Sequence, residues 1–263
     1  MKLHEAEVEC GQRFEFGANW ERFLDELDEA RICLAEMSLK DMLEVDSLND
    51  IRFLDAGSGR GLFSLAARRL GAEMHSFDFD PKSVACTEFL KKRFSPKDSQ
   101  WKVEKGSVLE KGYLSSLGSF DVVYSWGVLH HTGAMWQAME NILPLVRIGG
   151  KLYISIYCDR GKWSRIWLIV KRIYNRLPRI LRWIVLVPAF VRLWGPAMIR
   201  DLAAWKPFYT WKNYGRLGVR GMSPWRDFVD WVGGLPFEVS SPEKIFDFYR
   251  NRGFRLDRLK TRV

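Results

Sequence analysis

Three glycines and an aspartate stand together in the stretch IRFLDAGSGRGLFSLAARRL, residues 51–70. Gly57, Gly59 and Gly61 have no Cβ, so the turn can bend sharply and a ligand can lie directly on its backbone. Their spacing differs from the Gly-x-Gly-x-x-Gly of dinucleotide sites and from the Gly-Lys-Ser/Thr of phosphate-binding loops. Asp55, at the end of the preceding apolar strand, would repel a phosphate and attract a cation. The turn therefore predicts a ligand that carries positive charge.

A second acid follows at the distance that a nucleoside would need. Asp78 ends a predicted strand, residues 73–78, about twenty residues beyond the glycines. In open parallel sheets a carboxylate at this strand end binds the hydroxyls of a ribose. One acid for a positively charged amino-acid end and one for a ribose together indicate S-adenosylmethionine.

The two motifs resemble those of the class I S-adenosylmethionine-dependent methyltransferases. LDAGSGRG is similar to their first motif and SFDFDP to their second, and the resemblance covers roughly residues 53–157. Within that class the chain is similar to the quinone-methylating enzymes. The resemblance implies methyl transfer from S-adenosylmethionine on a Rossmann-like fold, a doubly wound and mostly parallel sheet with helices on both faces.

The resemblance also assigns the cofactor contacts, because ligands of such sheets bind outside the carboxyl ends of the strands. Asp55 and the glycine turn would hold the methionine end, and Phe79 would cover the adenine. Ser107 stands where the family often has an acidic residue at the adenine amino group. The tip of the fourth strand would border the methionine chain. The predicted contacts are Asp55, Gly57, Ser58, Gly59, Gly61, Asp78, Phe79, Ser107, Val108, Ser125 and Trp126.

Two histidines follow the fourth strand by one turn, where quinone- and sterol-methylating relatives carry Glu-His. By this placement His131 matches the family histidine and His130 replaces the Glu. A histidine with a pKa near 6.5 can take a proton from a substrate hydroxyl as the methyl group arrives. The alternative is that the histidines order the loop, His131 by bonding a backbone carbonyl. Tyr157 and Asp159, at the tip of the fifth strand, are candidate substrate contacts.

Strands and helices alternate from residue 51 to residue 158, which predicts a parallel sheet with helices on both faces. We expect strands at 51–55, 73–78, 100–105, 120–126 and 150–158, and helices near 62–70, 82–93 and 134–147. Gly149 and Gly150 are expected to end the last of these helices. Four segments follow: an N-terminal helical cap (1–50), the cofactor-binding core (51–158), a helical insertion (159–240), and the last helix and strand of the core (241–263).

The N-terminal cap is predicted from apolar residues at three- and four-residue steps, Trp20, Phe23, Leu24 and Leu27 among them. At the other end, FRLDRLKTRV (254–263) indicates a sixth strand. The resembled class ends with one more strand, for which no residues remain, so we expect that final strand to be missing.

The insertion carries the basic character of the chain. Residues 160–220 contain fourteen Lys or Arg and one acid, Asp201, a net charge of +13, whereas the remainder has 27 basic and 31 acidic residues. The same segment holds six of the twelve tryptophans. Its apolar run Trp183–Ile199 is shorter than the ~20 residues of a bilayer-spanning helix. A helix lying in a membrane interface suits the mixture of Arg, Trp and aliphatic residues better.

Three interpretations of the insertion stay open: a lid on the acceptor pocket, a membrane-surface element, and, less favoured, a nucleic-acid surface. We expect a cytoplasmic protein, peripheral at the inner face of the membrane if the second holds, because residues 1–17 are too charged for a signal peptide. Four cysteines without a CxxC pair and few spare acids predict no metal site.

Taken together, these patterns predict transfer of a methyl group to a small-molecule acceptor. We expect its hydroxyl to be the target and the acceptor to be quinone-like, lipid-linked or glycan-related. The missing Asn/Asp-Pro-Pro-Tyr/Phe and Pro-Cys stretches disfavour methylation of base amino groups and of cytosine C5. The alternatives are an RNA-directed methyltransferase that uses the basic insertion, and a non-catalytic S-adenosylmethionine-binding partner protein.

Overall fold

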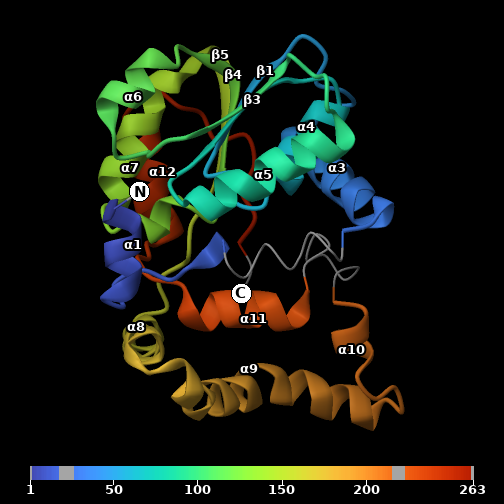
Figure 1. Ribbon diagram of the computed structural model, residues 1–263, viewed down its shortest axis with the longest axis vertical. Coiled ribbons are helices and arrows are strands. Elements are labelled where there is room, and N and C mark those ends of the chain that lie inside the picture. Colours follow the sequence, from blue (N-terminus) through green and yellow to red (C-terminus); the bar gives the residue numbers. More distant parts are fainter. Residues whose placement is uncertain (1, 18–26, 215–222, 262–263) are drawn as a thin grey trace.

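The computed structural model describes residues 2–17, 27–214 and 223–261. Its centre is a sheet of parallel strands in the order β3-β2-β1-β4-β5 (Figure 1). The strands are β1 (Arg52–Ala56), β2 (Glu73–Asp78), β3 (Trp101–Lys105), β4 (Phe120–Trp126) and β5 (Val146–Ser155). This order is that of a doubly wound sheet whose direction of winding reverses next to β1, so the prediction of a Rossmann-like fold is confirmed.

Two apolar cores cover the two faces of the sheet, because neighbouring residues of a strand point to opposite sides. Phe53 belongs to the core under α3 (Glu29–Leu43), α4 (Leu62–Arg69) and α5 (Pro81–Phe94). Leu54 belongs to the core under α6 (Lys111–Ser116), α7 (Met135–Ile142) and α12 (Pro242–Arg250). The near-continuous apolar sequences of the inner strands follow from this burial on both faces.

The fifth strand begins earlier than the sequence indicated. Gly149 and Gly150 lie inside β5, which starts at Val146, and do not end the preceding helix. That helix, α7, stops at Ile142 and is followed by a 3-10 helix, η3 (Leu143–Leu145). Pro144 explains the stop, since it has no N–H for a further helical hydrogen bond. The short helix α6 was not predicted.

The sixth strand expected at 254–263 is not formed by the described residues of that stretch, 254–261. Within the described chain the sheet therefore has five strands and β5 is an edge. Arg258 and Lys260 instead form ion pairs with Asp41 of α3, at 2.9 and 2.7 Å. These pairs hold the segment against a helix, so it does not pair with the edge of the sheet.

The N-terminal segment contributes α1 (Lys2–Glu9) and then runs toward the strand ends. The helix expected around Trp20, Phe23 and Leu24 lies outside the described residues. After it, Leu27 is buried, and Asp28 caps α3 by accepting a hydrogen bond from the Arg31 amide.

The insertion forms a helical layer with its own apolar cluster. Its elements are α8 (Lys162–Arg176), η4 (Arg179–Leu181), α9 (Trp183–Ala203), α10 (Tyr209–Lys212) and α11 (Pro224–Gly233). The cluster joins Tyr174, Trp194 and Phe228 to Phe14 of the N-terminal segment. α11 lies between the sheet and α9, which is the outermost helix (Figure 1). Within the described chain one stretch, Arg179–Ala203, is long and apolar enough to cross a bilayer by length and composition.

Candidate active site

The carboxyl ends of the strands open into a cavity of about 1960 Å³. A pocket for one small ligand has about 300–1,000 Å³, so this cavity has room for two molecules side by side. Its walls come from the glycine turn, the ends of β2 and β4, and the N-terminal segment, and from helices α8 and α11 of the insertion. The cavity also extends along β5, α3, α12 and the C-terminal segment 254–261.

The glycine turn is tied to β2 by its own backbone. The Gly57 and Ser58 amides both donate to the Phe77 carbonyl, at 2.9 and 3.0 Å. Gly57 has φ +92°, and a Cβ there would lie 2.4 Å from the Val128 side chain. Only glycine meets both conditions, the left-handed backbone and the close approach of Val128.

Asp55 lies at the cavity as a buried carboxylate held in a chain of hydrogen bonds. It accepts from the Ser64 hydroxyl at 2.5 Å, Ser64 accepts from Ser76 at 2.9 Å, and Ser76 accepts from the Trp101 indole at 3.0 Å. Burial, opposed by the Ser64 bond and reinforced by the charge of Asp78, raises the pKa of Asp55 to about 7. Within the described residues no cationic side chain pairs with it. A positively charged ligand group would supply that missing charge and favour the ionised carboxylate.

Asp78 closes the turn from the other side. Its Oδ2 accepts from the Gly59 amide and its Oδ1 from the Asp80 amide, each at 2.9 Å. Burial raises its pKa to about 6. Because a carboxylate has about four acceptor positions, Asp78 can still receive ribose hydroxyls from the cavity.

Phe79, the predicted adenine contact, lies at the cavity and is covered by the N-terminal segment. The Arg13 guanidinium lies 5.0 Å above its ring, and the edge of His4 lies 5.5 Å away. Arg13 also donates to the His131 carbonyl at 3.0 Å. One side chain therefore joins the N-terminal segment to both the second and the fourth strand ends.

Some of the other predicted cofactor residues line the cavity and the rest lie outside it. Ser58, Ser107, Val108 and Trp126 line the cavity, as do Gly57 and Gly59. Ser58 shares a hydrogen bond with Thr87 at 3.0 Å, Ser107 accepts from the Leu109 amide at 3.2 Å, and Trp126 stacks on Tyr153 at 5.6 Å.

Three predicted site residues do not line the cavity. Ser125 points to the opposite side of β4 from Trp126, and its hydroxyl donates to the Ala56 carbonyl at 2.8 Å. Gly61 packs on Thr87 as the N-cap of α4. Asp159 is exposed beyond the end of β5, where it accepts from the Gly161 amide at 2.9 Å. The structure thus places these three residues outside the lining of the cavity, and their contact with a ligand stays a prediction.

His131 has one ring nitrogen engaged and one available. Since a carbonyl oxygen can only accept, Nδ1 carries the proton and donates to the Pro236 carbonyl at 2.5 Å. This tautomer leaves Nε2 as an acceptor. Burial lowers the pKa of His131 to about 3, so the ring is neutral at physiological pH. The backbone contact of the loop-ordering interpretation is therefore present, and it also sets the tautomer that a base requires.

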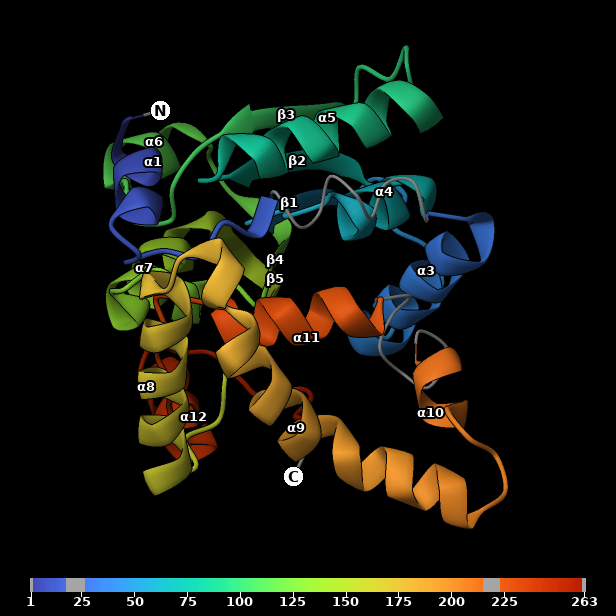
Figure 2. The ribbon, with the colours of Figure 1, turned by 60° about the horizontal axis from the view of Figure 1, so that its bottom comes forward.

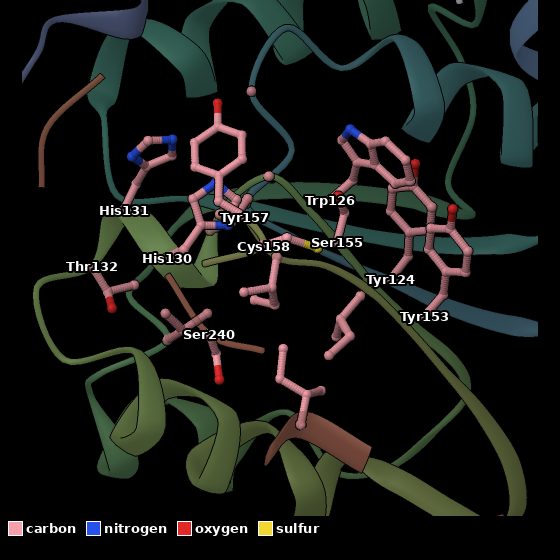
Figure 3. Close-up of a pocket in the computed structure, with 18 of the residues that line it drawn as sticks. Tyr124, Trp126, His130, His131, Thr132, Tyr153, Ser155, Tyr157, Cys158 and Ser240 are labelled. Carbon is pink, nitrogen blue, oxygen red and sulfur yellow. The ribbon is translucent and has the colours of Figure 1, made fainter. Parts of the chain in front are cut away.

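The rings of His130 and Tyr157 pack against His131 in tilted and edge-on arrangements. The ring of His130 lies 4.3 Å from that of His131 and 4.1 Å from that of Tyr157, and in the described chain its nitrogens make at most a weak hydrogen bond, to the Ser155 backbone. Burial and the neighbouring His131 lower the pKa of His130 far below its usual value. Burial, with Asp227 and Asp230, raises the pKa of Tyr157. Figure 3 shows these three rings on one side of the cavity and Tyr124, Trp126 and Tyr153 on the other.

Sequence reasoning missed the polar residues that the insertion adds. Asp227 and Asp230 of α11 line the cavity, and burial raises the pKa of Asp227. Lys171 of α8 is fully buried beside them, its Nζ donating to the Trp231 carbonyl, and burial lowers its pKa to about 7. The signal for the two acids was available, because residues three apart share one side of a helix and these interrupt an apolar helix. No pattern in the sequence around Lys171 indicated that it would be buried beside the cavity.

The described residues contain no group of three or more His, Cys, Asp or Glu side chains arranged to hold a metal ion.

Comparison with known proteins finds similarity in the core of the chain. Residues 54–152 match a family described as a methyltransferase domain. A tRNA U34 carboxymethyltransferase of Methylococcus capsulatus is 28% identical over 144 residues, 54% of this chain and 42% of that protein. The chain thus matches less than half the length of this curated relative.

Solved structures give weaker likenesses. A magnesium protoporphyrin IX methyltransferase of Synechocystis, crystallised with S-adenosylhomocysteine, is 18% identical, with 56% of this chain and 63% of that chain covered and a TM-score of 0.42. The YcgJ protein of Bacillus subtilis is 17% identical, with 52% and 58% covered and a TM-score of 0.45.

Proposed function

We propose, from the premise that residues 54–152 are a class I S-adenosylmethionine-dependent methyltransferase domain, that this protein methylates a hydroxyl of an apolar small molecule. The observation that carries the proposal is Asp55, a carboxylate buried at the cavity without a cationic partner. S-adenosylmethionine brings a sulfonium methyl group that leaves by in-line displacement. Its positive charges fit beside Asp55, and its ribose fits at Asp78.

The acceptor belongs in the remaining part of the cavity, between the strand ends and the insertion. Its walls include Tyr157, Phe237 and Trp167, with Asp230 at the side. Aromatic walls favour a quinone-like or lipid-linked acceptor over a glycan-related one, because a sugar would need many more polar partners.

His131 is the residue that we assign to the acceptor hydroxyl. Its Nδ1 is fixed by the Pro236 carbonyl, so Nε2 can accept a hydrogen bond and orient the hydroxyl for attack. A pKa of about 3 makes this ring a weak base, so orienting the hydroxyl is the main role that we assign to it. Its low pKa keeps the acceptor form available at every pH at which the protein would work.

RNA is the second acceptor class. It is favoured by the basic insertion, with its net charge of +13 over residues 160–220, and by the likeness to a tRNA-modifying protein. We favour the small molecule because aromatic side chains such as Tyr157, Phe237 and Trp167 line the acceptor part of the cavity, whereas a nucleic acid binds mainly through exposed cations.

The test is to incubate the protein with S-adenosylmethionine labelled in its methyl group and with fractionated cell extract. We expect label in an organic-extractable small molecule and release of S-adenosylhomocysteine. The Gly57→Ala variant, which places a Cβ against Val128, serves as the control without cofactor binding. Label in RNA would support the second class, and tight cofactor binding without turnover in any fraction would show a non-catalytic binding protein.

A further inference from the structure

Large apolar side chains are exposed along α8, η4 and α9, and we call this set of residues the outer face. Its residues are all between 45% and 80% exposed: Trp163, Ile166, Ile169, Ile173, Ile180, Trp183, Ile184, Val187, Val191 and Ile199. Figures 1 and 2 both show α9 as the outermost element on the side away from the sheet. Soluble monomers rarely expose so many large apolar side chains together, so this face calls for a partner.

The exposure is a property of one side of these helices. Ile184, Val187 and Val191 follow one another at helical steps on the outer side of α9. On its inner side Ala189 is buried in the cluster of the insertion, and Val185 and Leu186 pack against that cluster. α9 therefore has apolar residues on both its packed side and its open side.

Charge indicates what the partner is. Arg165, Arg172, Arg176 and Arg179 are exposed on α8 and η4 beside the apolar side chains, within the segment of net charge +13. An aliphatic surface flanked by Arg and Trp is what binds to the interface of a bilayer with anionic lipids. RNA would use the arginines but gain nothing from exposed Ile and Val.

We propose that the outer face docks on the surface of a bilayer that contains anionic lipids, with α9 lying in the plane of the interface. Although Arg179–Ala203 is long enough to span, its inner side is tied to the protein. Asp201 accepts from the hydroxyl and amide of Thr210, both at 2.7 Å, and Trp194 packs on Trp211. A spanning orientation would break these contacts, whereas an interfacial one keeps them.

The docked face borders the cavity, and this step rests on the proposed function. Trp163 of the outer face is 51% exposed and also lines the cavity, which Leu193 lines from the opposite side of α9. The Arg192 guanidinium lies 5.3 Å above the Trp163 ring at the same rim. An acceptor dissolved in the bilayer could therefore enter the cavity beside α8 and α9 without crossing water. The acceptor class is an amphiphile that carries a hydroxyl.

The experiment is co-sedimentation of the protein with vesicles of phosphatidylcholine alone and with vesicles that also contain phosphatidylglycerol. We expect binding to the anionic vesicles to be at least about tenfold stronger, and to weaken with salt without vanishing. The triple variant Ile184→Gln, Val187→Gln, Val191→Gln should bind the anionic vesicles at least about tenfold more weakly than the wild type. Ile148→Gln is the matched control, because Ile148 is fully exposed on β5, outside the insertion.

Cofactor affinity, measured by calorimetry, shows that each variant is folded. If the triple variant does not fold, Arg172→Gln, Arg176→Gln, Arg179→Gln replaces it, and loss of the preference for anionic vesicles is then expected. Wild-type protein that ignores both vesicles, or a labelled RNA hairpin bound in their place, would overturn the proposal. Vesicle binding without methyl transfer would instead leave docking intact and refute the proposed function alone.

Discussion

Asp55 is the side chain whose ionisation should respond most directly to the cofactor. Its pKa of about 7 reflects burial without a cation, and a bound cationic group would stabilise the ionised form. We therefore expect S-adenosylmethionine to bind more tightly as the pH rises toward 7, with protons released on binding below that pH. Asp55→Asn should weaken binding about ten- to a hundredfold, the value of a hydrogen bond to a charged group, and remove the pH dependence.

Titration calorimetry of the wild type and the variant across this pH range checks the prediction. Asp159→Asn is the matched control, because that carboxylate is exposed outside the cavity. An affinity that is independent of pH in the wild type would contradict the assignment of Asp55.

A second prediction concerns the two histidines and the turnover number. His131→Gln should lower the turnover number about tenfold, the contribution of one orienting hydrogen bond, and leave cofactor affinity within about twofold. His130→Leu should change turnover little, because His130 is buried with at most a weak hydrogen bond to the Ser155 backbone and an apolar residue of similar size suits that position. Single-turnover kinetics of both variants provide the comparison. Equal losses in the two would show that the pair only packs the loop.

The site residues whose place at the cavity was predicted from the sequence are those whose conformation depends on adjacent residues in the chain. Asp55, Gly57 and Asp78 stand at turns whose shape a few consecutive residues determine, and the structure places them at the cavity. Ser125 was assigned beside Trp126, although adjacent residues of a strand face opposite sides. Lys171 and Asp230 meet across about sixty residues of chain, and no local pattern encodes that contact.

At the scale of the element, the glycine turn can be tested by a pair of substitutions. Gly57→Ala adds a Cβ that meets Val128 at 2.4 Å, in addition to the strain of φ +92°. Gly118→Ala imposes a similar strain at φ +74° but has open space around it. We expect the second change to cost about 1–2 kcal/mol of stability and no cofactor affinity. The first should cost more and abolish binding, as urea unfolding and calorimetry would show. Equal effects would mean that Val128 moves aside freely.

Strands β1 to β4 were predicted more accurately than β5 and the last expected strand. Strands β1 to β4 lie within one residue of their expected bounds, since apolar runs flanked by turns determine them. In place of the last predicted strand, Arg258 and Lys260 pair with the carboxylate of Asp41 on α3, an alternative that the local pattern does not reveal. Pairing of an edge strand competes with such contacts, and only the folded chain shows which of them forms.

On the scale of the whole molecule, the fold carries buried ionisable groups of both signs near one cavity. Between its usual pKa of 3.8 and its raised value of about 7, Asp55 holds in the folded state a proton that the unfolded chain has lost. This contribution makes the protein less stable as the pH rises through that window. His131 acts in the opposite direction between 3 and 6.5, because the unfolded chain binds a proton that the folded state excludes.

Two variants should separate these opposing contributions in the cofactor-free protein. Relative to the wild type, Asp55→Asn should make the dependence of unfolding free energy on pH more positive between about pH 4.5 and 6. His131→Gln should make it more negative, each by up to about 1.4 kcal/mol per pH unit. Urea unfolding at several pH values gives both slopes. Changes of the same sign in the two variants would show that these groups do not titrate as their burial requires. The opposite signs are expected because burial favours the neutral form of both groups, which is the protonated carboxyl in one case and the deprotonated imidazole in the other.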